Sequence, residues 1–484
     1  MFEKALQKYK SLPIQIKATF WFLICSFLQK GISMITTPIF TRLLSTAEYG
    51  QYSVFNSWLG IATIFVSLNL SYGVYTQGLI KFDSERNVYS SSLQGLSLTL
   101  CLAWTIIYFV FHDFWNRLFS LSTVQMMAML IMIWTTAVFG FWAAEQRVKY
   151  SYRRLVAITL FVSLAKPIFG IFLVTHSHDK VTARILSLVI VELAVYVWLF
   201  FSQMHQGKVF FSSKFWKHAL IFSIPLIPHY LSQTVLNSAD RIMIDRMVNS
   251  ETAGIYSLAY SISQIMTLFS TALLQALNPW IYQKLKDRKV KDITKVAYPS
   301  LIAIAGVNIL LIALAPEIVA VFAPKSYYDA IWIIPPVSMS VYFIYAYSLF
   351  ADFEFYYEKT QYITFATVIG AVFNVVLNYI FIPRFGYYAA GYTTLFCYLL
   401  YNVFHYRFMN KICDEYLDGE SPYNTKYIVA ITAVFLAIGF SFLAVYNHSV
   451  IRYLYVAVLL LIIVINRKKI LRFMNTLMSV KGNK

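Results

Sequence analysis

Long runs of apolar residues without a charged side chain recur along this chain and constrain its fold more than any other feature. The segments Leu301–Leu314 and Leu454–Ile465 are two examples. A helix needs about 20 consecutive, mainly apolar residues to cross the hydrocarbon core of a bilayer, whereas the strands of an outer-membrane barrel alternate apolar and polar residues. Charged residues make up 13% of the chain, compared with roughly 25% in soluble domains. The sequence therefore predicts an all-α polytopic membrane protein.

Fourteen membrane-spanning helices can be placed on the sequence with this length criterion. Their expected bounds are residues 16–40, 49–75, 90–112, 118–142, 154–174, 182–203, 216–238, 253–277, 296–315, 327–350, 361–382, 388–408, 427–446 and 449–466. The connections are too short to form a nucleotide-binding domain or a catalytic domain, no Walker glycine-rich loop occurs, and the four cysteines lack the spacing of metal ligands. We therefore expect a protein that acts within the bilayer, is not an enzyme and holds no metal or cofactor.

Lysine and arginine residues gather on one side of these spans. With a cytoplasmic N-terminus, 29 of the 40 basic residues fall in cytoplasmic segments and nine on the opposite side, while Lys30 and Lys166 lie inside spans. Cytoplasmic segments of membrane proteins carry such an excess, so both termini are expected in the cytoplasm. The net charge of +18 is then a signal of topology and of contact with the anionic lipid bilayer, and nucleic acid is not an expected partner.

A short polar motif occurs twice, as RLLSTAEYGQYSV (Arg42–Val54) and RMVNSETAGIYSL (Arg246–Leu258), 204 residues apart. The identical positions include Arg42 and Arg246, Gly50 and Gly254, and Tyr52 and Tyr256. Each copy joins two consecutive spans, and six spans separate the copies, so both have the same orientation in the membrane. This indicates two six-helix lobes in parallel repeat, as in several secondary transporters. The alternative is a generic helix–turn–helix corner with a glycine in the turn.

The repeat divides the chain into an N-terminal lobe of residues 1–207, a C-terminal lobe of residues 208–410, and a part of residues 411–484 with two additional spans and a basic cytoplasmic tail. Both copies of the motif are expected at the periplasmic ends of spans. Their arginine, glycine and tyrosine residues are therefore predicted to act as scaffold or outer-gate residues rather than as the binding site.

Polar side chains form a stripe on the first span of each lobe. Ser26, Lys30, Ser33, Thr37 and Thr41 share one helical face in the first span, and His229, Gln233, Asn237 and Asp240 share one in the seventh. Polar faces of membrane helices turn toward protein or water rather than lipid, so both stripes are expected to line a central cavity between the lobes. The alternative for these stripes is hydrogen bonding between packed helices, which is favoured for the serine and threonine residues but not for Lys30.

Three ionisable residues lie near the middle of predicted spans, namely Lys30, Lys166 and Glu192. A charge at the bilayer centre costs roughly 2.5–3.5 kcal/mol, so such a residue usually has a partner or a function. Lys30 is expected to face substrate and to attract an anionic group such as a phosphate. Lys166 either joins it or forms an ion pair with Glu192 on the neighbouring span.

Other ionisable residues have less specific interpretations. Pro225 and Pro228 should kink the seventh span, and His229 within that kink is either a hydrogen-bonding core residue or, like Glu192, a residue that couples transport to an ion. Acidic residues near the inner end of the tenth span are expected to form a solvated cytoplasmic rim, and these are Asp352, Glu354 and Glu358. Glu192 is expected to be essentially the only carboxylate at mid-span.

Three segments resemble signature segments of the Wzx-type polysaccharide flippases, a branch of the multidrug/oligosaccharidyl-lipid/polysaccharide exporter (MOP) superfamily. They are TPIFTRLLSTAEYGQYSVF (37–55), NSADRIMIDRMVNSETAGIYSLAYSIS (237–263) and FNVVLNYIFIPRFGYYAAGYTTL (373–395). The resemblance implies fourteen helices in two lobes around a cationic cavity. It also implies transfer of undecaprenyl-diphosphate-linked oligosaccharide across the bacterial inner membrane for O-antigen, capsule or related glycans, with a polysaccharide polymerase and a chain-length regulator as further partners.

This resemblance places the diphosphate on Lys30 and Lys166, with polar side chains such as Ser33, Thr37, His229, Gln233 and Asn237 contacting the rest of the substrate. Relatives have several basic residues in the cavity, and this chain offers fewer at mid-span. A cation-coupled drug or metabolite exporter of the same superfamily is the alternative function, and it would favour a buried acidic site. A membrane-embedded transferase or polymerase is disfavoured by the short loops.

Overall fold

The computed structural model describes residues 13–467 and assigns helices, and no strand, within that range. The predicted all-α polytopic fold is confirmed. The basic residues before position 13 and the basic tail after position 467, both used to predict topology, lie outside the described residues.

The chain divides into two compact units, an N-terminal unit (Met1–Thr234) and a C-terminal unit (Val235–Lys484). The division falls within helix α11, whereas the predicted lobe boundary falls at the end of α9. The helices that begin in the N-terminal unit are α2 (Ile14–Leu43), α3 (Thr46–Ser67), α4 (Val74–Lys81), η1 (Asp83–Glu85), α5 (Arg86–Val110), α6 (His112–Phe119), α7 (Thr123–Val148), α8 (Tyr152–Thr175), α9 (Lys180–Gly207), α10 (Ser213–Ser223), η2 (Ile224–Leu226) and α11 (Ile227–Met247).

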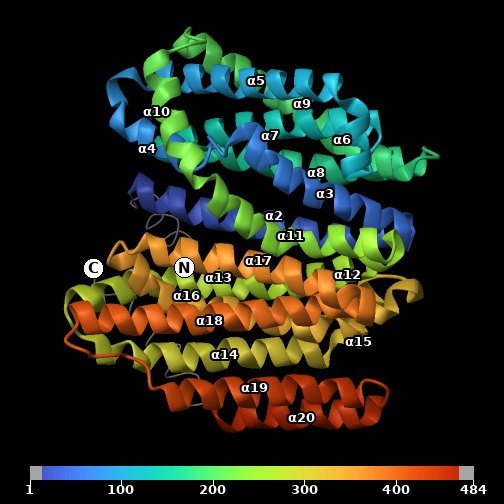
Figure 1. The fold of residues 1–484 in the computed structure, drawn as a ribbon, viewed down its shortest axis with the longest axis vertical. Helices are drawn as coiled ribbons and strands as arrows, with labels where there is room; N and C mark the ends of the chain where they lie inside the picture. Colours follow the sequence, from blue (N-terminus) through green and yellow to red (C-terminus); the bar gives the residue numbers. More distant parts are fainter. Residues whose placement is uncertain (1–12, 468–484) are drawn as a thin grey trace, which may run out of the picture. The chain divides into compact units, whose positions relative to one another are not determined.

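The C-terminal unit continues from α11 to the end of the described chain (Figure 1). Its further helices are α12 (Ser250–Ser263), α13 (Ile265–Lys286), η3 (Val290–Asp292), α14 (Thr294–Ala313), α15 (Ala315–Phe322), η4 (Lys325–Trp332), α16 (Ile334–Tyr356), α17 (Thr360–Phe385), α18 (Tyr388–Tyr416), α19 (Thr425–Val445) and α20 (Ser449–Ile465).

Each of the fourteen predicted spans overlaps a helix of the structure. Within the described residues, 11 helical segments are long and apolar enough to cross a membrane. The other three predicted spans correspond to α3 and α18, which carry more polar residues, and to α20, which is shorter. The predicted break in the seventh span is confirmed, because α10 ends at Ser223 and a 3-10 turn containing Pro225 leads into α11.

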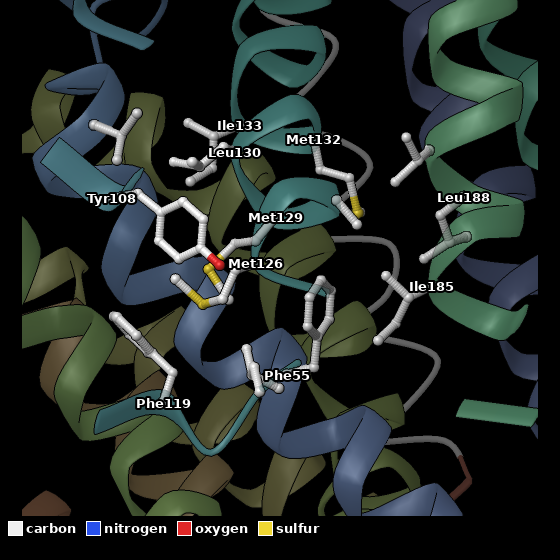
Figure 2. Packing of buried hydrophobic residues seen from close by; sticks show 14 of the residues in the cluster. Phe55, Tyr108, Phe119, Met126, Met129, Leu130, Met132, Ile133, Ile185 and Leu188 are labelled. Atoms are coloured by element: carbon white, nitrogen blue, oxygen red, sulfur yellow. The ribbon is translucent and has the colours of Figure 1, made fainter. Parts of the chain in front are cut away.

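Packing in the N-terminal unit centres on α9, which contacts α3, α5, α7 and α8, while α2 packs on α8. Figure 2 shows a cluster of buried apolar side chains that joins α3, α5, α6, α7 and α9. It includes Phe55, Tyr108, Met129 and Ile185. In the C-terminal unit α16 has the central place, since it contacts α12, α13, α14, α17, α18 and α19. Side chains around the whole circumference of α16 are buried.

The two copies of the repeated motif adopt the same local structure. Helix α2 ends at Leu43 and α3 begins at Thr46, and helix α11 ends at Met247 and α12 begins at Ser250, which is the same offset of 204 residues. The residue before each second helix is an N-cap: Ser45 accepts a hydrogen bond from the N–H of Glu48 at 3.2 Å, and Asn249 accepts one from the N–H of Thr252 at 2.8 Å. The two copies of the motif thus share one local structure, and the parallel repeat of two six-helix lobes stays a prediction.

Gly95 on α5 allows the loop after α9 to approach closely. A Cβ atom on Gly95 would lie 2.1 Å from the carbonyl oxygen of Phe210, a backbone atom that cannot rotate away. Gly95→Ala is therefore expected to destabilise the protein by about 1–3 kcal/mol and to lower its thermal unfolding midpoint in detergent. Gly306→Ala is the matched control, since a Cβ atom there would meet no described atom within 4 Å. Equal midpoints for the two variants would contradict this packing.

Candidate functional site

The stripe on α2 presents Lys30 near the middle of a 30-residue helix. The side chains of Lys30 and Ser33 are exposed, and Thr37 is half-buried with its hydroxyl donating to the carbonyl of Ser33 at 3.0 Å. Helix α2 packs on α8 through a different face, where the side chain of Gln29 donates to Ser163 at 3.3 Å. In the described part of the chain, Lys30 forms no ion pair. An exposed ammonium at this depth is tolerated facing water rather than hydrocarbon, so this face of α2 is suited to line an aqueous path.

Lys166 on α8 is held by a buried carboxylate. Its Nζ donates to Oε1 of Glu192 on α9 at 2.6 Å, and Thr135 on α7 donates to Oε2 of the same carboxylate at 2.5 Å. Glu192 is 3% exposed. Of the two alternatives for Lys166, the ion pair with Glu192 is the one that the structure shows. Because Glu192 neutralises the charge of Lys166, Lys30 is the better placed of the two lysines to meet an anion.

Arg184 is a buried cation that the sequence did not identify, because its position near the start of a span placed it with the loop residues. It lies on α9, 8% exposed, with its guanidinium 3.7 Å from the ring centre of Phe40 and 5.4 Å from that of Tyr52. Its Nη1 donates to the carbonyl of Lys166 at 3.4 Å. Arg184 therefore adds positive charge close to α2, α3 and α8. The spacing of eight residues to Glu192, which places both on one helical face, was the available signal.

The stripe on α11 is shared between the two units. His229 is half-buried and Gln233 is exposed, and both belong to the N-terminal unit. Asn237 belongs to the C-terminal unit, where its Oδ1 accepts hydrogen bonds from the hydroxyls of Tyr260 and Tyr398, each at 3.2 Å. Asn237 thus already has partners within its own unit, which agrees in part with the alternative of hydrogen bonding between packed helices.

Asp240, the last residue of that stripe, accepts hydrogen bonds from three other helices. It is 2% exposed, and its carboxylate accepts from the hydroxyl of Tyr256 at 2.6 Å, the side-chain amide of Asn378 at 2.6 Å and the hydroxyl of Thr394 at 2.8 Å. These donors come from α12, α17 and α18. Tyr256 of the repeated motif is therefore a structural partner of a buried carboxylate.

The other residues of the repeated motif lie at helix ends and in tight packing. Arg42 and Arg246 are exposed, and Nη1 of Arg42 donates to the carbonyl of Pro38 at 2.8 Å. Gly50 and Gly254 are both buried in the first turn or two of their helices. This arrangement is compatible with the predicted scaffold role, and a role as a gate stays a prediction.

Glu192 is not the only buried carboxylate, although the others lie toward the ends of their helices and leave Glu192 as the carboxylate at mid-span. Four further carboxylates on helices are at most 3% exposed, namely Glu145, Asp240, Asp352 and Glu354. The solvated rim predicted for the end of α16 is wrong for Asp352 and Glu354, and of that group only Glu358 is exposed. Asp352 and Glu354 are buried because α16 is enclosed by neighbouring helices almost to its C-terminal end. Within the described residues, no group of three or more His, Cys, Asp or Glu side chains could hold a metal ion.

Solved transporter structures share this fold. An inward-facing multidrug resistance transporter of the MATE family within the MOP superfamily has a TM-score of 0.57 and 13% sequence identity, covering 80% of this chain and 95% of that one. A MOP superfamily transporter from Pyrococcus furiosus, described as having a binding pocket of reverse polarity, has a TM-score of 0.54, 13% identity and coverage of 82% and 95%. These similarities show a shared fold, that of a polytopic membrane protein built from helices long enough to cross a bilayer.

The family follows from the sequence comparisons. The family model described as polysaccharide biosynthesis protein matches residues 16–285, more than half of the chain, and the MatE model matches residues 225–380. The chain belongs to the polysaccharide biosynthesis protein family, and the predicted relation to the flippase branch of the MOP superfamily is confirmed. A relative from Haemophilus influenzae, named Lsg locus putative protein 1, is 24% identical over 384 residues, 73% of this chain and 88% of the relative.

Proposed function

We propose that the protein is a flippase for undecaprenyl-diphosphate-linked oligosaccharide. It transfers repeat units from the cytoplasmic to the periplasmic leaflet of a bacterial inner membrane by alternating access, for assembly of O-antigen, capsule or another surface polysaccharide. Both termini lie in the cytoplasm in this proposal. The match to the polysaccharide biosynthesis family over residues 16–285 supports the substrate class.

The observation that carries the proposal is the exposed ammonium of Lys30 at mid-span, without an ion-pair partner in the described part of the chain. A lipid-linked diphosphate presents negative charge at the junction of an apolar tail and a polar glycan, and an unpaired cation facing water attracts that charge. Lys30 would hold the diphosphate. Arg184 would increase the positive potential nearby, and Lys166 would contribute whenever Glu192 releases it.

The sugars would contact polar side chains on the two stripes. Hydroxyls and amides exchange hydrogen bonds with sugar hydroxyls as they do with water, so a path lined by them moves a glycan without a large desolvation cost. The residues assigned to this path are Ser33 and Thr37 on α2 and His229, Gln233 and Asn237 on α11. The polyprenyl tail would remain in the lipid.

A cation-coupled drug or metabolite exporter of the same superfamily is the second candidate. The match to the MatE model over residues 225–380 and the buried carboxylate of Asp240 in that region favour it. An organic cation would need an acidic site that is open to solvent, whereas Asp240 is enclosed and already accepts three hydrogen bonds from neutral donors.

Deletion of the gene in the native host separates the two functions. The flippase is expected to leave intact lipid-linked repeat units on the cytoplasmic side and to reduce surface polysaccharide, which can be measured by extraction of lipid-linked glycan and by its accessibility to a glycan-modifying enzyme in inverted vesicles. Reintroduction of the gene should restore both. Normal surface polysaccharide combined with increased drug sensitivity would refute the flippase and establish the exporter.

A further inference from the structure

A buried acid–base pair joins α16 and α18 in the C-terminal unit. Nδ1 of His405 lies 2.7 Å from Oε1 of Glu354. The side chains are 1% and 0% exposed respectively, and Glu354 stands near the C-terminal end of the span formed by α16. This pair has no part in the substrate path proposed above.

The surroundings of this pair supply little compensating charge. In the described part of the chain, His405 is the ion-pair partner of Glu354, and Oε2 of Glu354 has no hydrogen-bond partner. The ring of Tyr347 stacks on His405 with centroids 5.1 Å apart, and Tyr401 meets it edge-on at 6.0 Å. His405 is the titratable group that acts on Glu354. Asp352, two residues earlier on α16, interacts with a separate group of side chains, Tyr282, Tyr345 and Tyr423.

Such a pair changes its charge when it takes up one proton. Ionised Glu354 beside a neutral His405 carries one negative charge, and addition of a proton gives either an ion pair or two neutral side chains, with no net charge. Burial of an uncompensated charge costs several kcal/mol, so the proton-free state requires either water or a change in packing around the carboxylate. Proton occupancy and local structure are therefore coupled at this position.

A purely structural contact between α16 and α18 would not require ionisable groups. Helices α16 and α18 are already joined by a neutral hydrogen bond, from the side chain of Asn402 to the carbonyl of Phe343 at 2.8 Å. The free oxygen of Glu354 and the imidazole of His405, which carries a second ring nitrogen, provide a place for an additional proton.

The pair lies close to a loop from which a proton could enter. Glu354 is two residues from the end of α16 at Tyr356, and its carbonyl accepts a hydrogen bond from the N–H of Lys359 at 2.8 Å. Glu358 in the intervening turn is exposed. The distance from the exposed turn to the pair is about one helical turn. In the predicted topology this loop is cytoplasmic.

We propose that Glu354 and His405 together form the proton-binding site that couples the transport cycle to a transmembrane proton gradient. A proton from water binds to Oε2 of Glu354 or to the second ring nitrogen of His405, removes the net charge of the pair and favours the closed packing of α16 on α18. Its release restores the negative charge and favours the arrangement in which the pair is hydrated. The identity of the transported molecule rests on the proposed function, but proton binding does not.

Proton binding can be measured directly on the purified full chain in liposomes by pH-difference infrared spectroscopy. We expect bands of a carboxyl group or an imidazole that change when the pH is varied and that are absent from Glu354→Gln and His405→Gln. Glu415→Gln is the matched control, because Glu415 is a carboxylate on α18 that pairs with Lys359 in an exposed position. Identical difference spectra for all four proteins would overturn the proposal.

The same variants test coupling in the deletion host. Glutamine at position 354 can still accept a hydrogen bond from His405 but cannot take up or release a proton. If the pair is only a structural contact between the helices, Glu354→Gln should give normal surface polysaccharide, and that result would overturn the proposal. If the pair is a proton-binding site, Glu354→Gln should lose surface polysaccharide. The double variant Glu354→His/His405→Glu retains one acid and one imidazole in contact, and we expect it to recover more transport than either single variant. Surface expression and thermal unfolding show whether each variant is folded.

The infrared measurement and the analysis of lipid-linked glycan in the deletion host together separate this inference from the proposed function. Proton-dependent bands in a protein whose deletion leaves lipid-linked glycan unchanged would retain the proton site and reject the flippase. Accumulated glycan together with absent bands would retain the flippase and reject the proton site.

Discussion

Lys30→Ala is expected to abolish delivery of lipid-linked glycan while leaving the protein folded in the membrane. The Lys30 side chain is exposed and forms no ion pair in the described part of the chain, so its removal breaks no such contact. If its ammonium holds the diphosphate, the loss of a charge-assisted contact weakens binding by about 1.5–3 kcal/mol, or roughly ten-fold to more than a hundred-fold. Complementation of the deletion host, scored as surface polysaccharide, measures the effect.

Three further variants make this result specific. Lys30→Arg retains the positive charge and should retain much of the activity, whereas Lys30→Met retains the length of the side chain and should not. Lys289→Ala removes an exposed lysine from the loop after α13 and should have no effect. Full complementation by Lys30→Ala, at normal protein level, would remove Lys30 from the binding site.

Lys166→Ala is a less specific test, although the resemblance to the flippases assigns both lysines to the diphosphate. Its removal leaves the buried carboxylate of Glu192 with the hydroxyl of Thr135 as its remaining described partner. Loss of one member of a buried ion pair typically costs about 3–5 kcal/mol. We therefore expect Lys166→Ala to reduce the amount of folded protein. The double variant Lys166→Met/Glu192→Gln removes both charges and tests whether the pair has a role in transport beyond stability.

The order of the helices could be predicted from the sequence because each span is a local property of about 20 residues. The repeated motif could be recognised from the sequence for the same reason, because its structure is local. The same capped turn follows α2 and α11, and the two turns are separated by the 204 residues that separate the motifs. The break at Pro225 follows from the chemistry of proline, which lacks the backbone N–H and restricts the preceding residue. None of these features depends on which helices later become neighbours.

The depth of individual carboxylates could not be predicted in the same way. Side chains on all faces of α16 are apolar or aromatic, so the sequence shows no exposed face, and a glutamate two residues before its end reads as a rim residue. Glu354 is buried because His405, 51 residues away, lies opposite it. Two partners of Asp240 are similarly distant in the sequence: Asn378 is 138 residues away and Thr394 is 154 residues away. The burial of these carboxylates is determined by contacts between residues that are far apart in the sequence. The periodicity of a single helix carries no information about such contacts.

Asp240→Ala is expected to unfold the C-terminal unit at a much lower temperature than the wild type. The buried carboxylate accepts hydrogen bonds from Tyr256, Asn378 and Thr394, so its removal leaves three donors on three helices without their acceptor. A buried donor without a partner costs about 1–3 kcal/mol, which predicts a loss of at least about 3 kcal/mol if the donors cannot reach water or one another. Thermal unfolding of the purified protein in detergent, followed by tryptophan fluorescence, measures the shift.

Graded variants at this position separate the charge of Asp240 from its geometry. Asp240→Asn retains one acceptor oxygen but directs an amide N–H toward neighbouring donors, so its unfolding temperature should lie between those of the wild type and Asp240→Ala. Asp245→Asn on the same helix is the matched control, because Asp245 is half-buried and accepts a hydrogen bond from Ser250 at 2.6 Å. It should shift the midpoint little. If Asp240→Ala unfolds no earlier than Asp245→Asn, the carboxylate does not hold the four helices together, and its burial must serve transport instead of stability.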